Sequence, residues 1–296
     1  SMRISENSMI QDYLKNLEEV RERWFDWNSQ VSSGKKLRKP SDGPSESSRL
    51  VRIRDEFSRI NQYMRNLSRA DSKLALADST LNSVRNLTIQ ASEKASFALT
   101  GTTSQTGREA IALELRGILE NLEALASTSQ DGLYIFSGSR VDAPPLDDSG
   151  GSYVYQGDDR VPEIEIAPGE RVQVSVTGGE IFTNPAGDVM NSLRRLIDHL
   201  EAGDIDQARL AFGELQQGGK AIDGARFKVS KGITQVENAR TRLQDRLQNL
   251  TQEVSSLEDA DMAEAISRMV QAETALNAAL QAGARLRQGY LFDFLG

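Results

Sequence analysis

The sequence predicts a mainly α-helical protein in which long helices from both ends of the chain form an antiparallel coiled-coil rod, with a small antiparallel β insert in the middle. Apolar residues at heptad spacing occupy both terminal thirds, whereas short alternating runs and turn residues fill the centre. The chain is 38% hydrophobic and 6% aromatic. So low an apolar content suits the narrow seams of long helices better than the core of a compact enzyme.

The composition of the 296 residues excludes several kinds of chemistry. Without cysteine there is no disulfide, thiolate zinc site or cysteine nucleophile, and His199 is the only histidine. The net charge of −8 argues against a nucleic-acid partner, and no apolar run reaches the roughly 20 residues of a membrane helix. We therefore expect no cofactor, no metal site, no catalytic residue, no nucleic-acid binding and no membrane insertion.

The first expected helix has a clear heptad seam. Its apolar residues recur at alternating gaps of three and four, and they are Ile10, Tyr13, Leu17, Val20, Trp24, Trp27 and Val31. Gly34 ends the helix, because glycine readily adopts the left-handed conformation found there. The segment 35–44, with two prolines and four basic residues, is expected to be an extended connector. An anionic partner is the alternative, less favoured in an acidic chain.

A very long second helix is expected to begin near Ser45, with Ser45 or Ser47 as its N-cap. Its seam continues to residue 98 through Leu50, Ile53, Phe57, Ile60, Met64, Leu67, Ala70, Leu74, Ala77, Leu81, Val84, Thr88, Ala91, Ala95 and Ala98. After a break at 101–107, a third helix is expected from about Arg108 to Ser127. The face that it buries comprises Ile111, Leu115, Ile118, Leu122 and Leu125.

The middle of the chain has the pattern of short strands. These are expected at 133–136, 153–155, 163–166 and 171–176, with turns at Pro168-Gly169 and Gly178-Gly179. The Asp147-Asp148 and Asp158-Asp159 pairs carry calcium-type ligands. They fit no EF-hand loop, so exposed turn carboxylates are the favoured interpretation.

Helical pattern resumes at Val189 and turns at 201–204. A last helical stretch then runs from about Ile205 almost to the end, with a phase change at 258–261. Its seam includes Val229, Val236, Leu243, Leu247, Leu250, Val254 and Leu257, followed by Met262, Ile266, Met269, Leu276 and Leu280. Small residues crowd positions 272–284, and the chain closes with an apolar tail at 290–296.

These elements divide the chain into five parts. We expect an N-terminal assembly helix and connector at 1–44, a first rod segment at 45–140 and a β domain at 141–187. A second rod segment at 188–257 and a C-terminal assembly helix at 258–296 follow. The terminal seams fit two arrangements equally well: an intramolecular bundle, or packing against equivalent helices of neighbouring subunits.

Motifs for enzymatic chemistry are missing from the sequence. No strand leads into a phosphate-binding glycine loop, and Phe136-Ser137-Gly138-Ser139 lacks the Gly-x-Ser-x-Gly spacing of a nucleophile elbow. His199 lies within an expected helix, where a surface or interhelical histidine is the favoured interpretation. A hydrolase or metal-dependent enzyme within the β insert therefore remains only as the rival to an assembly protein.

Several segments resemble a known family, and they span nearly the whole chain: Met2–Ser5, Val31–Leu37, Pro40–Pro44, Leu119–Ala126, Gly132–Gly138, Tyr155–Asp158, Asp261–Ile266 and Leu291–Leu295. With these segments the chain resembles the flagellin superfamily. The Pro-Ser-Asp-Gly-Pro run at 40–44 and the Tyr-Ile-Phe-Ser-Gly run at 134–138 resemble the branch that joins the flagellar hook to the filament. The alternative is a filament flagellin subunit.

The resemblance implies a structural protein, exported by the flagellar type III apparatus and located outside the cell in the bacterial flagellum. Its implied partners are neighbouring copies of itself, other hook-associated proteins, filament subunits and an export chaperone that holds the C-terminal helix. The terminal helices would order on assembly. We expect intersubunit packing at Ile10, Tyr13, Leu17, Val20, Trp24, Trp27, Leu276, Leu280, Leu291, Phe292 and Leu295.

Overall fold

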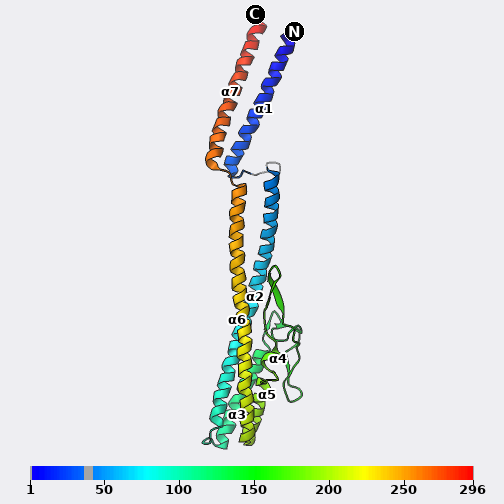
Figure 1. The fold of residues 1–296 in the computed structure, drawn as a ribbon, viewed down its shortest axis with the longest axis vertical. Helices are drawn as coiled ribbons and strands as arrows, with labels where there is room; N and C mark the ends of the chain where they lie inside the picture. The colour runs from blue at the N-terminus through cyan, green and yellow to red at the C-terminus, as the bar shows by residue number, and fades with distance from the viewer. Residues whose placement is uncertain (1, 37–42, 296) are drawn as a thin grey trace. The chain divides into compact units, whose positions relative to one another are not determined.

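The computed structural model describes the backbone of residues 2–36 and 43–295 and the side chains of residues 9–36 and 43–285. Helices dominate this part of the chain (Figure 1): α1 (Met2–Ser33), α2 (Pro44–Ala98), α3 (Gln105–Ala126), α4 (Gly178–Ile181), α5 (Val189–Ala202), α6 (Ile205–Glu258) and α7 (Met262–Leu295). The prediction of a mainly α fold with a small antiparallel β insert is confirmed.

The chain forms two compact units. Unit 1 comprises Ser1–Ser58 with Arg246–Gly296, and unit 2 comprises Arg59–Asp245. Helices α2 and α6 contribute residues to both units. The five-part division expected from the sequence remains a proposal.

Helices α2 and α6 run antiparallel in unit 2. Asp71 pairs with Arg240 at 3.4 Å and Arg85 with Asp223 at 2.7 Å, so residue numbers rise along one helix as they fall along the other. Helix α3 packs on α5, where the Gln105 side-chain amide donates to the carbonyls of Leu200 and Glu201. The core between these helices contains Leu67, Leu74, Leu81, Leu115, Leu122, Leu193 and Leu196, all fully buried.

The long seam expected along α2 is buried at every position except Phe57 and Met64, which are half-buried. The start of α2 differs from the expectation. Ser47 N–H donates to the Gly43 carbonyl at 2.8 Å, so the helix begins at Pro44 and neither Ser45 nor Ser47 is its cap. Proline suits this first position because it has no backbone N–H to leave unpaired. Helix α3 likewise begins at Gln105 rather than at Arg108, because the Ser104 side chain caps it.

The β region consists of three antiparallel two-stranded pairs, not one sheet. They are β1 (Ser129–Gln130) with β2 (Leu133–Tyr134), β3 (Leu146–Asp147) with β4 (Val154–Tyr155), and β5 (Glu163–Ala167) with β6 (Glu170–Gln173). Gly169 turns β5 into β6 with φ +71°. The strand expected at 133–136 ends at Tyr134, because the Phe136 carbonyl instead accepts Gly178 N–H at 2.7 Å.

One further expectation needs correction. Gly178-Gly179 is not a turn between strands but the start of α4, because the Thr177 side chain accepts Glu180 N–H as an N-cap.

The last helical stretch divides into α6 and α7 at the expected phase change, residues 258–261. The Asp261 carboxylate accepts the N–H groups of Ala263 and Glu264 at 3.0 and 3.1 Å and so starts a new helix.

Candidate assembly surface

Helices α1 and α7 lie side by side in unit 1 (Figure 1). Along α7 the more buried side recurs at gaps of four and three, through Ala265, Met269, Ala272, Leu276, Ala279 and Gly283. This side matches the heptad seam of α1, where Val20 is 6% exposed. The two terminal seams therefore meet within one chain.

Large side chains of α1 face the smallest residues of α7. The Tyr13 hydroxyl donates to the Ala279 carbonyl at 2.9 Å, and a Cβ added to Gly283 would lie 1.9 Å from that hydroxyl oxygen. Trp27 and Val20 line a cavity of about 190 Å³ with small residues of α7, among them Ala272. Tyr13 and Trp27 are thus accommodated beside small residues of α7.

The structure places eight of the eleven candidate assembly residues in three environments. Val20 is buried, whereas Tyr13, Leu17, Trp24, Trp27 and Leu276 are half-buried along the seam. Ile10 and Leu280 are 39% and 51% exposed. Leu291, Phe292 and Leu295 belong to α7, and their side chains lie outside the described residues.

Six further apolar side chains of this helix pair are exposed. We call them together the outer apolar face, and they are between 40% and 59% exposed: Met9, Leu14, Phe25, Met262, Ile266 and Val270. Phe25 meets Trp24 edge-on, with ring centroids 5.2 Å apart, and the Arg21 guanidinium lies 5.8 Å from its centroid.

Sequence reasoning missed Leu14 and Phe25 because each directly follows a seam aromatic. A signal for them was present in the sequence: both are apolar residues next to the seam, at positions where a solvent-exposed helix surface normally has charged side chains. Met262 and Ile266 were assigned to the seam, yet both are exposed. Large apolar side chains that stay exposed in a folded chain are candidates for protein–protein contacts.

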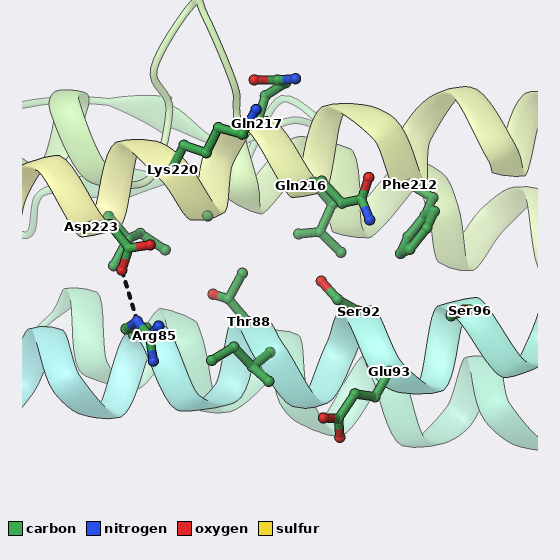
Figure 2. Close-up of a pocket in the computed structure, with 14 residues that line it drawn as sticks. Arg85, Thr88, Ser92, Glu93, Ser96, Phe212, Gln216, Gln217, Lys220 and Asp223 are labelled. Carbon is green, nitrogen blue, oxygen red and sulfur yellow. Dashed lines mark hydrogen bonds and ion pairs between the residues drawn. The ribbon is translucent and has the colours of Figure 1, made fainter.

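Unit 2 contains a groove of about 780 Å³ between α2 and α6 (Figure 2). Phe212 and Gln216 of α6 point across it toward Thr88 and Ser92 of α2. Its charged residues balance, with Arg85 and Lys220 against Glu93 and Asp223. This surface offers apolar, hydroxyl and amide groups for packing, and its lining contains no histidine.

The β region brings two of the quoted sequence motifs together around Tyr155. Its hydroxyl donates to the carbonyls of Phe136 and Asp158, each at 3.0 Å, and burial raises its pKa to about 12. The ring packs against Gly178 and Gly179, where an added Cβ would lie 3.0 and 2.8 Å from ring carbons. The tyrosine thus holds the 132–138 and 155–158 segments to the start of α4.

Three of the four aspartates in the aspartate pairs of this region, Asp147, Asp148 and Asp158, make local contacts. Asp158 accepts Ser139 N–H at 2.8 Å, and its hydrogen bonds with Ser139 lower its pKa. Asp147 accepts the N–H and hydroxyl of Ser149, and Asp148 pairs with Arg194 at 3.2 Å. Across the described side chains, no group of three or more potential metal ligands is close enough to hold an ion. No described helix is long and apolar enough to span a membrane.

Comparison with known proteins identifies the family. Residues 4–140 match the bacterial flagellin N-terminal helical region, and residues 215–295 match the bacterial flagellin C-terminal helical region. The chain belongs to the bacterial flagellin family. The first matched region covers α1 from residue 4 onward, and the second covers the whole of α7.

Full-length relatives within the flagellin family have a more specific name. The chain is 25% identical to flagellar hook-associated protein 3 of Escherichia coli, over 95% of this chain and 96% of that protein. It is 27% identical to flagellar hook-associated protein 3 of Salmonella typhimurium, over 94% of each. The solved flagellar junction protein FlgL of Legionella pneumophila has the same fold, with a TM-score of 0.62 and 16% identity over 71% of this chain and 99% of that one.

Proposed function

We propose that this protein is a structural component of the bacterial flagellum that joins the hook to the filament. The observation that carries the proposal is its similarity, over almost its whole length, to two relatives named flagellar hook-associated protein 3. Both relatives favour the junction over the alternative of a filament flagellin subunit. Membership of the flagellin family supports a structural role rather than an enzymatic one.

The assembly contacts in this proposal belong to the terminal helices. Segments 1–44 and 258–296 serve as assembly helices, while 45–140 and 188–257 form the rod segments and 141–187 the β domain. The seam residues hold α1 to α7, and the outer apolar face, with Ile10 and Leu280, meets neighbouring subunits. An exposed apolar surface at both chain ends supports this assignment, because its burial would stabilise contacts between subunits.

The remaining partners follow from the same role. The protein is exported and acts outside the cell, in contact with copies of itself, other hook-associated proteins and filament subunits. An export chaperone holds the C-terminal helix before assembly. The chaperone binds α7, whose Met262, Ile266 and Val270 side chains are exposed and would otherwise face water before assembly.

Deletion of the gene in the source bacterium tests the proposal. The expected cells build hooks without filaments and release filament subunits into the medium, because the subunits have no junction on which to assemble. Re-expression of the intact chain restores filaments. Mutant cells with filaments of normal length would refute the junction role, and hooks and filaments lost together would indicate an earlier step.

A further inference from the structure

Glu258 is a buried carboxylate at the end of α6, and the residue is only 7% exposed. Its Oε2 accepts a hydrogen bond from Lys35 Nζ at 2.6 Å, and its Oε1 accepts one from Arg54 Nη2 at 3.0 Å. Burial of a charge is unfavourable unless the charge is paired and hydrogen-bonded. Both oxygens of Glu258 meet this condition, and the hydrogen bond from Lys35 lowers its pKa despite its burial.

The backbone at the same place ties together two chain connections. Lys36 N–H donates to the Glu258 carbonyl at 2.6 Å, and Ala260 N–H donates to the Gly34 carbonyl at 3.0 Å. Lys35 and Asp259 form an antiparallel bridge between these bonds. We call the residues Gly34–Lys36, Arg54 and Glu258–Ala260 the clasp.

The clasp lies where both helices have ended. Gly34 follows α1 with φ +69°, and residues 259–261 separate α6 from α7. The helical ladders end with the bonds from Gly34 N–H to the Gln30 carbonyl and from Asp259 N–H to the Ser255 carbonyl. Beyond them, the N–H groups of Lys36 and Ala260 depend on other partners, and these are the carbonyls of the opposite connection.

We propose that the clasp locks the α1–α7 pair to the ends of α2 and α6 within unit 1, and that the charge of Glu258 keeps the lock closed. Loss of that charge leaves Lys35 and Arg54 without their shared anion. The two backbone bonds beside it then open more often, while unit 2 remains folded. The inference rests on these contacts alone and is independent of the proposed function.

Hydrogen exchange of the full-length chain at neutral pH tests the lock, with the Lys36 and Ala260 amides as reporters. In Glu258→Gln these amides are expected to exchange on the order of tenfold faster, because a neutral amide accepts hydrogen bonds from Lys35 and Arg54 less strongly than the carboxylate does. Glu253→Gln is the matched control. It removes a carboxylate of the same helix that pairs with Arg49 at 2.6 Å, but it touches neither connection.

A double variant and an internal reference complete the experiment. Lys35→Gln with Glu258→Gln should exchange at the same rate as Glu258→Gln alone, because the ion pair that loss of Lys35 would break is already absent. Amides of α5 should stay protected in every variant, which shows that unit 2 is folded. The lock is refuted if the wild-type reporters exchange without protection, or if Glu258→Gln and Glu253→Gln behave alike.

Discussion

At the scale of single residues, Gly138 is closely constrained by the backbone of Asp158 in the β region. Gly138 has φ +66°, and a Cβ there would lie 2.2 Å from the Asp158 carbonyl oxygen, a backbone atom that cannot move aside cheaply. The glycine was visible in the sequence motif at 134–138. Its close contact was not, because the neighbouring atom comes from a segment about twenty residues further along the chain and is brought there only by folding.

Substitution of Gly138 should therefore destabilise the protein. We expect Gly138→Ala to lower the free energy of unfolding by about 1–3 kcal/mol, through the positive φ and the displaced Asp158 backbone. Gly150→Ala is the control, since Gly150 lies in the same region with nothing within 4 Å of an added Cβ. Urea unfolding of both variants measures the difference, and equal midpoints would contradict the close contact.

The buried hydroxyl of Tyr155 leads us to predict that the folded protein loses stability at high pH. Its folded pKa of about 12 lies above the ordinary value of 10 because burial disfavours the phenolate. The folded state therefore keeps a proton that the unfolded state releases, and the tyrosine's contribution is complete below pH 10 and is lost as the pH rises toward 12.

The variant Tyr155→Phe removes this titration and also two hydrogen bonds to carbonyls. We expect it to be less stable than the wild type at neutral pH, but to lose less further stability between pH 9 and 11. Urea midpoints across that range provide the measurement. Tyr153, whose pKa burial also raises to about 12, remains in both proteins, so the difference between them isolates Tyr155. Parallel curves for the two proteins would show that Tyr155 is not responsible.

At the scale of elements, periodicity located the long helices well. The α2 seam follows from spacing alone, because apolar residues at gaps of three and four share one helix face whatever packs against it. The two-residue strands β1 and β3 and the short helix α4 were missed. Such short elements depend on distant partners, as Leu146 does on Tyr155 and Gly178 on the Phe136 carbonyl. Elements of two to four residues are also too short to show the repeating hydrophobic pattern of a helix or a strand.

The α2 seam yields a prediction for its leucines. Leu81 is fully buried, and Leu81→Ala should reduce the free energy of unfolding by about 2–5 kcal/mol, because it removes buried apolar groups and leaves a cavity. Leu210→Ala makes the same chemical change at a residue of α6 that is 63% exposed, and it should change stability by less than about 1 kcal/mol. Chemical denaturation compares the two, and similar losses would contradict the assignment of Leu81 to the core.

At the scale of the whole molecule, the sequence could not distinguish an intrachain helix pair from packing between subunits. A heptad seam specifies that a helix has a partner, but it does not specify which chain supplies that partner. The structure assigns Tyr13, Val20 and Trp27 to the intrachain pair. The outer apolar face remains exposed on the same two helices, so packing within the chain leaves these side chains available for contacts between subunits.

The outer apolar face therefore leads to a prediction about assembly. The double variant Ile266→Ser with Val270→Ser changes residues that are 46% and 51% exposed, so the folded chain should keep its helicity and thermal stability. If neighbouring subunits bury both side chains, their loss weakens each contact by about 3 kcal/mol, on the order of a hundredfold. Cells that carry only this variant should swim poorly and release filament subunits.

The matched control is Leu113→Ser with Phe227→Ser, which removes two apolar side chains of unit 2 that are 69% and 74% exposed. Motility and the amount of filament protein in the medium should then stay at wild-type levels. Equal defects in the two variants would mean that exposed apolar area in general, and not the α1–α7 pair, supports assembly. Normal filaments in the Ile266 and Val270 variant would show that the outer apolar face is not part of the contact between subunits. A contact that buried these two side chains against a neighbour would be weakened by two serines, and filament assembly would then suffer.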